Sequence, residues 1–332
     1  NAILYLPFLL LPLLFFIYRY FKLSLASNSL PIPPAPKPWP IIRNLFQTGK
    51  MPHVTLALCA KSYGPLISLR FRTQIMILGS SREAAMEILK THDHKLSAPF
   101  VPHILPVERS QLNNMSIGWI SEYNGGRPSL FQTQHWNLKH GLLPADTGTS
   151  TATVELTMTE LIRIPECISW IVEEPSRKIH NHITLDGDLS QLSYLQACGK
   201  ESLRLHPPTP LLQHHQSKHF WFVVVSINIW SIGRNPAYWE DPLSLRPERF
   251  MNSKLDYLGN DFRYIPFSSG KRICPGMPMA SKQIQLLLAN LIYFLDWSLP
   301  RGKKLTVLDM IKKSQFLLHK NEPPCVIPKA RN

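Results

Sequence analysis

The sequence is short of acidic residues, and this shortage narrows the possible partners. It holds 22 Asp and Glu against 36 Lys and Arg, so the net charge is +14. Such an excess favours nucleic acid or an anionic membrane surface as a partner. The basic residues are scattered, however, with neither a long basic run nor a recognisable nucleic-acid-binding module. We therefore expect no nucleic-acid partner, but a basic surface that contacts lipid headgroups or an acidic protein.

Cysteine is also scarce, with five residues in a chain of 332. Their odd number and irregular spacing indicate neither a disulfide framework nor a zinc site, so we expect the domain to face a reducing cytosol. The stretch from His214 to His219 is rich in imidazole, which suits zinc or copper. It has no cysteine or carboxylate beside it, and we interpret it as a solvated loop. No internal repeat is present, and a chain of this length forms one large domain or two.

One apolar run stands out, at residues 2–18, and Arg19 follows it. It predicts a membrane anchor over residues 1–22 with its basic side in the cytoplasm, although the run is near the lower length limit of a spanning helix and two prolines weaken it. The alternative is a cleaved signal peptide, with Ser24–Ser27 as a small-residue cleavage site. Because no basic segment precedes the run, we favour the anchor.

Residues 23–45 are rich in proline and predict a stiff, extended hinge. The remainder, residues 46–332, is expected to form the main domain. Alternation of apolar and polar residues around turn signals predicts a hairpin, and helical spacing predicts amphipathic helices. The expected elements are a helix over Val54–Tyr63, a hairpin of Leu66–Phe71 and Gln74–Leu78, a helix over Glu83–Leu89, a loop over 99–120, a helix over Met279–Phe294, and closing strands within 305–328.

A lone cysteine, Cys274, lies in the glycine-bracketed loop from Phe267 to Gly276, just before an apolar helix. A thiolate presented in this way suits ligation of haem iron, because it pushes electron density onto the metal and favours O–O cleavage. The alternative for the residue alone is a buried structural cysteine.

The rest of the loop fits the same interpretation. Gly270 and Gly276 allow a tight turn or the close approach of a flat macrocycle. Arg272 can donate a charge-assisted hydrogen bond to a haem propionate. Phe267 can pack beside the sulfur and exclude water.

Three sequence blocks carry a family resemblance. The loop fills every fixed position of Phe-x-x-Gly-x-Arg-x-Cys-x-Gly, Glu201 and Arg204 form a Glu-x-x-Arg, and residues 247–250 read Pro-Glu-Arg-Phe. Along the chain the Glu-x-x-Arg comes first, then the Pro-Glu-Arg-Phe and then the cysteine loop, and in that order the blocks resemble the plant microsomal cytochrome P450 monooxygenases. Within that family, Lys37–Pro40 and the segment from Ser80 to Asp93 resemble the group that contains geraniol hydroxylases and N-methylcoclaurine hydroxylase.

The resemblance implies a mainly α fold with a small β-sheet region. Cys274 would be the axial ligand of haem b, and Glu201, Arg204 and Arg249 would form a structural network behind the haem. Electrons would come from NADPH through NADPH–cytochrome P450 reductase, and one oxygen atom of O2 would be placed on an apolar terpenoid or benzylisoquinoline alkaloid. The enzyme would be anchored in the endoplasmic reticulum membrane and face the cytosol.

Two departures from the family pattern stand out. Near residues 125–141 the expected Trp and Arg are lacking and distal helices have no counterpart, which predicts an internal deletion and an incomplete fold. In the segment that resembles the oxygen-activating helix, glycine and Asp146 have exchanged places, while Thr149 keeps its position. Asp146 and Thr149 are the candidate proton relay; the alternative for Thr149 is an ordinary helical threonine bonded to a carbonyl. An inactive remnant and a haem-binding module without turnover remain alternatives to the enzyme.

Overall fold

The computed structural model describes most of the chain. The described residues are 14, 18, 32–40, 42–71, 74–96, 98–99, 142–178, 188–212, 215–217, 222–300, 312–314 and 317–331. Most of the apolar run, the expected loop after residue 99 and the region of the expected deletion lie outside this set, so the described residues do not test those predictions. Half of the His-rich stretch is described, and there the solvated-loop prediction was wrong: His215 and Gln216 form a short strand that is hydrogen-bonded on both sides within the sheet.

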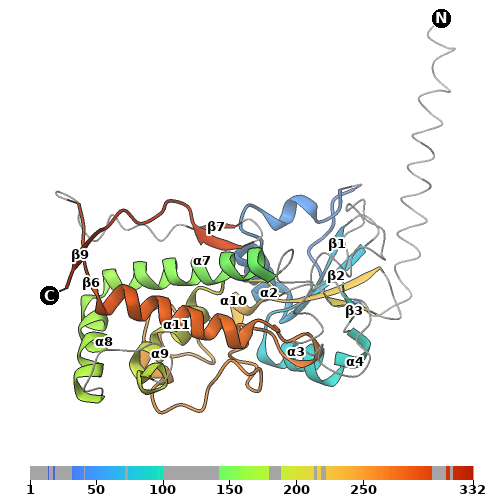
Figure 1. The fold of residues 1–332 in the computed structure, drawn as a ribbon. Helices are drawn as coiled ribbons and strands as arrows, with labels where there is room; N and C mark the ends of the chain where they lie inside the picture. Colours follow the sequence, from blue (N-terminus) through green and yellow to red (C-terminus); the bar gives the residue numbers. More distant parts are fainter. Residues whose placement is uncertain are drawn as a thin grey trace, which may run out of the picture.

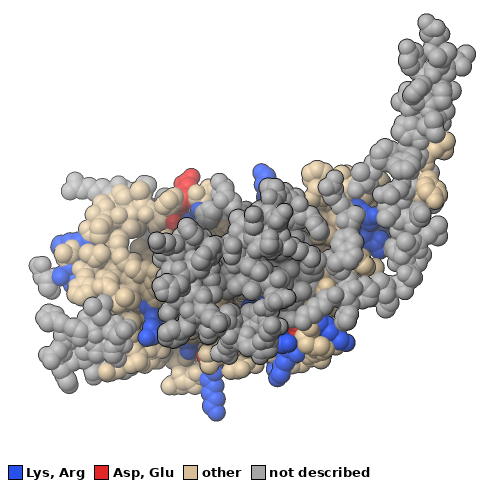
Figure 2. Space-filling view, turned by 45° about the vertical axis from the view of Figure 1, so that its right-hand side comes forward, with Lys and Arg blue, Asp and Glu red and all other residues tan. Residues whose placement is uncertain are grey.

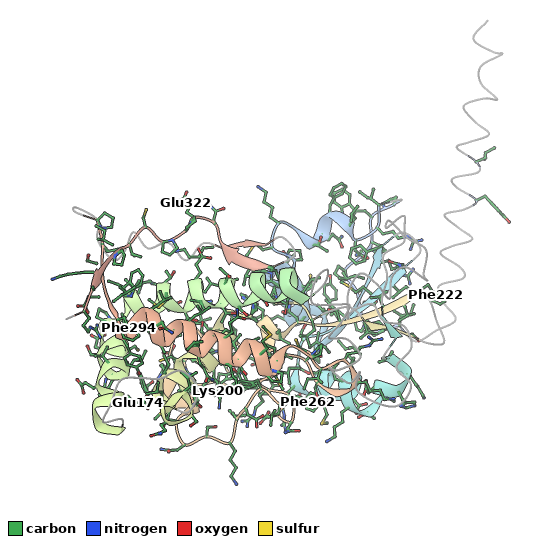
Figure 3. The ribbon with its side chains drawn as sticks, in the orientation of Figure 1. Glu174, Lys200, Phe222, Phe262, Phe294 and Glu322 are labelled. Atoms are coloured by element: carbon green, nitrogen blue, oxygen red, sulfur yellow. The ribbon has the colours of Figure 1, made fainter. Side chains whose placement is uncertain are left out.

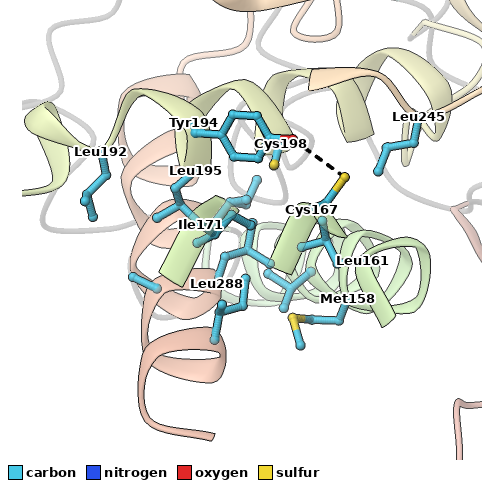
Figure 4. Packing of buried hydrophobic residues seen from close by; sticks show 14 of the residues in the cluster. Met158, Leu161, Cys167, Ile171, Leu192, Tyr194, Leu195, Cys198, Leu245 and Leu288 are labelled. Carbon is cyan, nitrogen blue, oxygen red and sulfur yellow. Dashed lines mark hydrogen bonds between the residues drawn. The ribbon is translucent and has the colours of Figure 1, made fainter. Parts of the chain in front are cut away.

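The larger part of the fold is a group of helices around one apolar core. Helices α7 (Leu142–Arg163) and α11 (Met277–Tyr293) pack together and begin at the same end, as Figure 1 shows, and α8 (Pro165–Lys178) and α9 (Ser193–Leu205) pack against both. Burying each large apolar side chain stabilises the fold by about 1.5–3 kcal/mol. The side chains with no exposed surface in this core (Figure 4) are Leu161, Ile171, Leu192, Leu195, Cys198, Leu288 and Ile292.

Helix α7 is rich in threonine, and its hydroxyls bond within the helix. Thr153 Oγ1 donates to the Thr149 carbonyl at 2.9 Å, and Thr157 Oγ1 donates to the Thr153 carbonyl at 2.6 Å. This back-bonding satisfies the hydroxyls in an apolar setting. Pro165 cannot continue α7 but suits the first turn of a new helix, so it separates α7 from α8.

Helix α9 is capped by a side chain from another helix. Glu174 of α8, labelled in Figure 3, accepts hydrogen bonds from the Tyr194 backbone N–H at 2.9 Å and the Leu195 backbone N–H at 3.3 Å. A carboxylate at a helix N-terminus accepts hydrogen bonds from the free N–H groups and is attracted to the positive end of the helix dipole. The contact therefore fixes the start of α9 against the end of α8.

The β-sheet region confirms the predicted hairpin and extends it. Strands β1 (Leu66–Phe71) and β2 (Gln74–Gly79) are antiparallel, with Leu66 opposite Gly79, and β2 pairs in parallel with β5 (Val223–Ile227). The described sheet order is β1-β2-β5-β4-β3, with β4 at His215–Gln216 and β3 at Ala98–Pro99. Helix α2 (Pro52–Tyr63) packs on β1.

Short elements connect the sheet to the helices. The predicted helix at 83–89 is split, because α3 ends at Met86 and a π-helical turn follows. The remaining bounds are α3 Arg82–Met86, η3 Glu87–Thr91, α4 Asp93–Leu96, η2 Leu45–Thr48, η5 Asp188–Gln191, α10 Ile229–Ile232, η6 Pro247–Phe250, η7 Gly270–Arg272, β6 Leu295–Ser298, β7 Lys312–Ser314, β8 Leu318–Lys320 and β9 Ile327–Ala330.

The predicted class, mainly α with a small sheet region, is confirmed. Lys and Arg side chains are spread over the face shown in Figure 2, where Asp and Glu are fewer. Within the described ranges, no helix is both long enough and apolar enough to cross a membrane.

Candidate haem-thiolate site

The predicted pair Glu201 and Arg204 is formed and fully buried. The two residues are three apart on α9 and therefore share one face of the helix. Arg204 Nε donates to Glu201 Oε2 at 2.7 Å, and Arg204 Nη2 donates to Glu201 Oε1 at 2.8 Å. Neither side chain has exposed surface. A two-point contact of this kind gives the pair a fixed geometry as well as charge compensation.

Arg249 also contacts Glu201. Its Nε donates to Glu201 Oε1 at 3.2 Å, and the backbone N–H of Arg246 donates to the same oxygen at 2.9 Å. Arg204 also donates to the carbonyls of Gly233, Pro242 and Ser244. Because Glu201 and Arg204 each have several hydrogen-bond partners, both buried charges are neutralised by an opposite charge and also satisfied by hydrogen bonds.

A second link between α9 and η6 was not predicted from the sequence. Tyr194 donates from its hydroxyl to Glu248 Oε1 at 3.0 Å, and the same hydroxyl contacts the Cys167 sulfur at 3.7 Å. Burial raises the pKa of Tyr194, so the hydroxyl remains a donor. Glu248 is the acid of the Pro-Glu-Arg-Phe block, so its place in that block was the sequence signal that could have predicted this contact.

The Cys274 loop closes on itself through its backbone. The Cys274 N–H donates to the Phe267 carbonyl at 2.9 Å, and the Met277 N–H donates to the Cys274 carbonyl at 3.3 Å at the start of α11. Cys274 is half-buried. A Cβ on Gly276 would lie 3.8 Å from the Cys274 sulfur, so this glycine keeps the space beside the sulfur open.

Aromatic packing and a strained turn hold the first half of the loop. The Phe267 ring meets the Tyr257 ring edge-on, with centroids 5.7 Å apart. Ser268 has a φ of +66°, a rare conformation for a residue with a side chain. Its buried hydroxyl has no hydrogen-bond partner among the residues that the structure describes. Such strain and such orphaned groups cluster at functional sites.

On α7, Thr149 is half-buried, and its carbonyl accepts the bond from Thr153. The side chain of Asp146 lies outside the described set, so its predicted role stays a prediction. Next to Thr149, a Cβ on Gly148 would lie 3.1 Å from Leu317 Cδ1. Leu317, in the closing segment of the chain, therefore packs against α7 at Gly148, the glycine that exchanged places with Asp146.

Further along α7, the buried pair of Glu160 and His206 was not predicted from the sequence. Glu160 Oε1 lies 2.8 Å from His206 Nε2, and Arg163 Nη1 donates to Glu160 Oε2 at 3.2 Å. His206 directly follows α9, so this contact joins α7 to the helix that carries Glu201. The signal in the sequence was the Leu-His-Pro-Pro run after Arg204.

Among the other described cysteines, Cys167 and Cys198 are buried, whereas Cys59 is half-buried like Cys274. Burial raises the pKa of Cys198 well above its usual range and also raises the pKa values of Cys167 and Cys59. Cys167 and Cys198 belong to the helical core, where they pack as structural residues, and Cys59 lies on α2.

Comparisons with known proteins identify the family. The family model described as Cytochrome P450 matches residues 33–116 and 139–324. The chain is 29% identical over 477 positions to probable (S)-N-methylcoclaurine 3'-hydroxylase isozyme 2 of Coptis japonica, covering 95% of this chain and 97% of that protein. It is 37% identical over 254 positions to iridoid oxidase of Catharanthus roseus, covering 71% of this chain and 49% of that protein. A structure of zebra fish cytochrome P450 with progesterone gives a TM-score of 0.66 at 14% identity, covering 84% of this chain and 99% of that one.

The same comparisons bear on completeness. The Coptis alignment spans 477 positions, whereas this chain has 332 residues, so long stretches of that relative have no counterpart here. The family match also leaves out residues 117–138. The chain is therefore shorter than this plant relative, while its fold matches that of the zebra fish cytochrome P450 structure. Because the match extends over most of the chain, this protein belongs to the cytochrome P450 family of haem-dependent monooxygenases, among plant relatives that include N-methylcoclaurine hydroxylases, and is a shortened member of it.

Proposed function

We propose that the chain is a haem-thiolate monooxygenase in which Cys274 is the axial ligand of haem b. The observation that carries the proposal is the loop from Phe267 to Gly276, which fills the family pattern and presents a half-buried sulfur at the start of α11. Cys167 and Cys198 are buried in the helical core, and Cys59 and Cys325 lie outside any comparable loop.

The residues of the loop fit a haem. The space beside the sulfur at Gly276 suits a flat macrocycle, and the orphaned Ser268 hydroxyl is a polar group that a bound cofactor could satisfy. Bound haem supplies the activation of dioxygen. The chain would contribute Arg272 as a propionate partner, Phe267 as the ring that keeps water from the sulfur, and Gly270 as the residue that permits the turn.

The remaining roles are divided between two elements. Glu201, Arg204 and Arg249 would hold the protein behind the haem in one arrangement. Thr149 and Asp146 on α7 would move protons to the reacting oxygen, since a hydroxyl and a carboxylate can exchange a proton through a short relay. Helices α7 and α11 begin at the same end of the bundle in Figure 1, which supports a site between Thr149 and the Cys274 loop.

The substrate proposal follows the names of the relatives. The curated relatives include N-methylcoclaurine 3'-hydroxylases and an iridoid oxidase. We propose an apolar plant specialised metabolite as substrate, either a terpenoid or a benzylisoquinoline alkaloid, which is hydroxylated or oxidatively coupled. NADPH–cytochrome P450 reductase would supply the electrons, and the net charge of +14 suits an acidic partner.

The proposed organisation keeps the sequence boundaries. Residues 1–22 would anchor the chain in the endoplasmic reticulum membrane, 23–45 would form the hinge, and 46–332 the shortened domain, deleted near 125–141 and facing the cytosol.

A second candidate is favoured by the missing length. An inactive remnant, or a haem-binding module without turnover, would keep the α9 network and the Cys274 loop but lack a closed substrate pocket. The aligned length of 477 against 332 residues motivates this alternative.

One experiment separates the candidates. The chain is expressed with haem supply, reduced under carbon monoxide, and compared with the Cys274→Ser variant by its Soret band. The enzyme and the binding module both predict a thiolate-type red shift that the variant loses; no shift in the parent chain excludes both. Product formation from terpenoid and alkaloid substrates with NADPH and reductase then distinguishes the enzyme from the module.

A further inference from the structure

A carboxylate far away in sequence contacts the Cys274 loop. Asp93, the first residue of α4, accepts a hydrogen bond through Oδ2 from the backbone N–H of Lys271 at 2.9 Å. Lys271 lies in the short η7 turn, three residues before Cys274. Hydrogen bonds in which the acceptor is ionised are stronger than neutral ones. Asp93 thus holds the turn that leads directly into the sulfur-bearing residue.

Gly270 shows how closely the loop is pressed onto the same segment. Its φ is +69°, in the left-handed region that favours glycine. A Cβ there would collide with the backbone carbonyl oxygen of Leu89 and lie 3.0 Å from Asp93 Oδ2. The Leu89 carbonyl belongs to the backbone and cannot rotate away. Two neighbouring residues of the loop therefore meet two points on the segment from Leu89 to Asp93, and the η7 turn packs against η3 and α4 near the right-hand end of the helices in Figure 1.

The segment that receives the loop has an unusual shape. Between Glu87 and Thr91 the helix widens into a π-turn, and the His92 N–H donates to the Glu87 carbonyl at 2.9 Å. Single π-turns are frequent at functional sites. The extra residue in this turn changes the direction in which the following residues, Asp93 among them, leave the helix.

The receiving segment is also firmly based. Ile88 and Leu89 are buried and belong to an apolar cluster with Phe262 and Ile265, which directly precede the loop in the chain. The loop and its support thus share one core. Because Asp93 follows a buried, well-packed segment, its carboxylate holds the loop at a lower entropic cost than a carboxylate on a mobile surface would.

We propose that Asp93 is a positioning residue for the axial thiolate, an inference that rests on the proposed haem-thiolate function. By holding the Lys271 N–H, Asp93 fixes the η7 turn, in which the Ile273 N–H donates to the Gly270 carbonyl at 3.2 Å. The next residue is Cys274, so the direction of its sulfur follows from the orientation of this turn. Asp93 thus acts on the loop through the Lys271 N–H.

The first test needs no cofactor. Amide hydrogen exchange of the peptide that spans residues 267–276 is compared among the parent chain, Asp93→Ala, Asp93→Asn and Glu87→Gln. Asp93→Ala should speed exchange in this peptide by about tenfold or more, which corresponds to loss of one hydrogen bond to a charged group. Asp93→Asn keeps an acceptor oxygen and should restore most of the protection. Glu87→Gln removes a negative charge from the same segment, where Glu87 pairs only at the surface with His92 at 3.5 Å, and should change nothing.

The second test uses the haem-loaded protein. Asp93→Ala should convert part of the thiolate-type Soret band under carbon monoxide into the unshifted form and raise the midpoint potential of the iron, while Asp93→Asn stays close to the parent. A merely structural role would lower the yield of folded protein and leave the band position and potential of the folded fraction unchanged.

The outcomes decide between the two ideas separately. If the parent chain shows no thiolate-type band, the proposed function fails, yet the exchange experiment still decides whether Asp93 orders the loop. Unchanged exchange in Asp93→Ala overturns the inference whatever the spectrum. Should Asp93→Ala fail to fold, Gly270→Ala provides an independent test, because its Cβ must push the loop away from Leu89; protection equal to the parent would again overturn the inference.

Discussion

Replacement of Arg204 by alanine should be the most destabilising single change in the network around Glu201. The substitution removes the guanidinium and with it five hydrogen bonds, two to Glu201 and three to the carbonyls of Gly233, Pro242 and Ser244. The Glu201 carboxylate would stay buried with fewer compensating partners.

The cost can be worked out from the burial of each arginine. Breaking a fully buried ion pair by removing one partner costs about 3–5 kcal/mol. The Arg249 side chain is 11% exposed and contributes one bond to Glu201, so Arg249→Ala should cost about 1.5 kcal/mol. The Arg246 side chain pairs with Glu240 at 3.8 Å with both groups exposed, so Arg246→Ala should cost at most about 0.5 kcal/mol.

The assay is denaturant unfolding followed by tryptophan fluorescence, because the buried Trp239 ring lies 5.1 Å from the Arg204 guanidinium. Arg204→Ala should lower the free energy of unfolding by about 3–5 kcal/mol, which is a large part of a typical stability of about 5–15 kcal/mol. Arg204→Lys keeps the charge but loses the two-point contact, and it should fall between Arg204→Ala and Arg249→Ala. Equal losses for Arg204→Ala and Arg246→Ala would refute the reasoning, since both remove one arginine from the same network region.

Further predictions concern three other places. Hydrogen bonds from Arg263 hold the pKa of Asp261 below its usual value. The stabilising contribution of the Asp261 carboxylate is therefore present above the unfolded pKa of about 3.9 and is lost as pH falls through the lower folded pKa. Asp261→Asn should flatten the decline in stability that urea unfolding shows below about pH 5, and an unchanged decline would contradict this. Cys198 should resist alkylation in the native state at about pH 8.5 and react on unfolding, as peptide mass spectrometry would show, because burial raises its pKa; rapid native labelling would be inconsistent with its place in the core. Gly148→Ala should cost about 1 kcal/mol through overpacking against Leu317, whereas in a Leu317→Ala background the same change should stabilise α7 by up to about 1 kcal/mol; identical effects in both backgrounds, measured by thermal unfolding, would show that the contact does not matter.

Local patterns predicted the elements whose partners are close in sequence. The hairpin of β1 and β2 follows from alternation around a turn, and α11 from its apolar face. Strand β5 was not predicted, because it pairs with β2 from a distant part of the chain. Parallel pairing between remote segments leaves no mark in the local sequence.

The site shows the same division. Glu201, Arg204 and Arg249 could be predicted because they lie in recognisable blocks, and the structure brings them together. The contact between Asp93 and Lys271 joins residues 178 apart in sequence. Neither the π-turn that precedes Asp93 nor the cap of α9 by Glu174 has a local signature, since both depend on how separate helices meet.

The described contacts between α9 and the Cys274 loop form a continuous path. The Phe250 and Tyr264 rings lie 4.9 Å apart, and the Tyr264 hydroxyl donates to the Lys200 carbonyl of α9 at 2.9 Å. Lys200 Nζ donates to the Leu255 carbonyl, close to the Tyr257 ring that meets Phe267. This path runs entirely within residues 193–276 and does not pass through the region where the family match is interrupted. Loss of distal helices can therefore leave the thiolate loop supported, so haem binding and turnover should be separable properties of this chain.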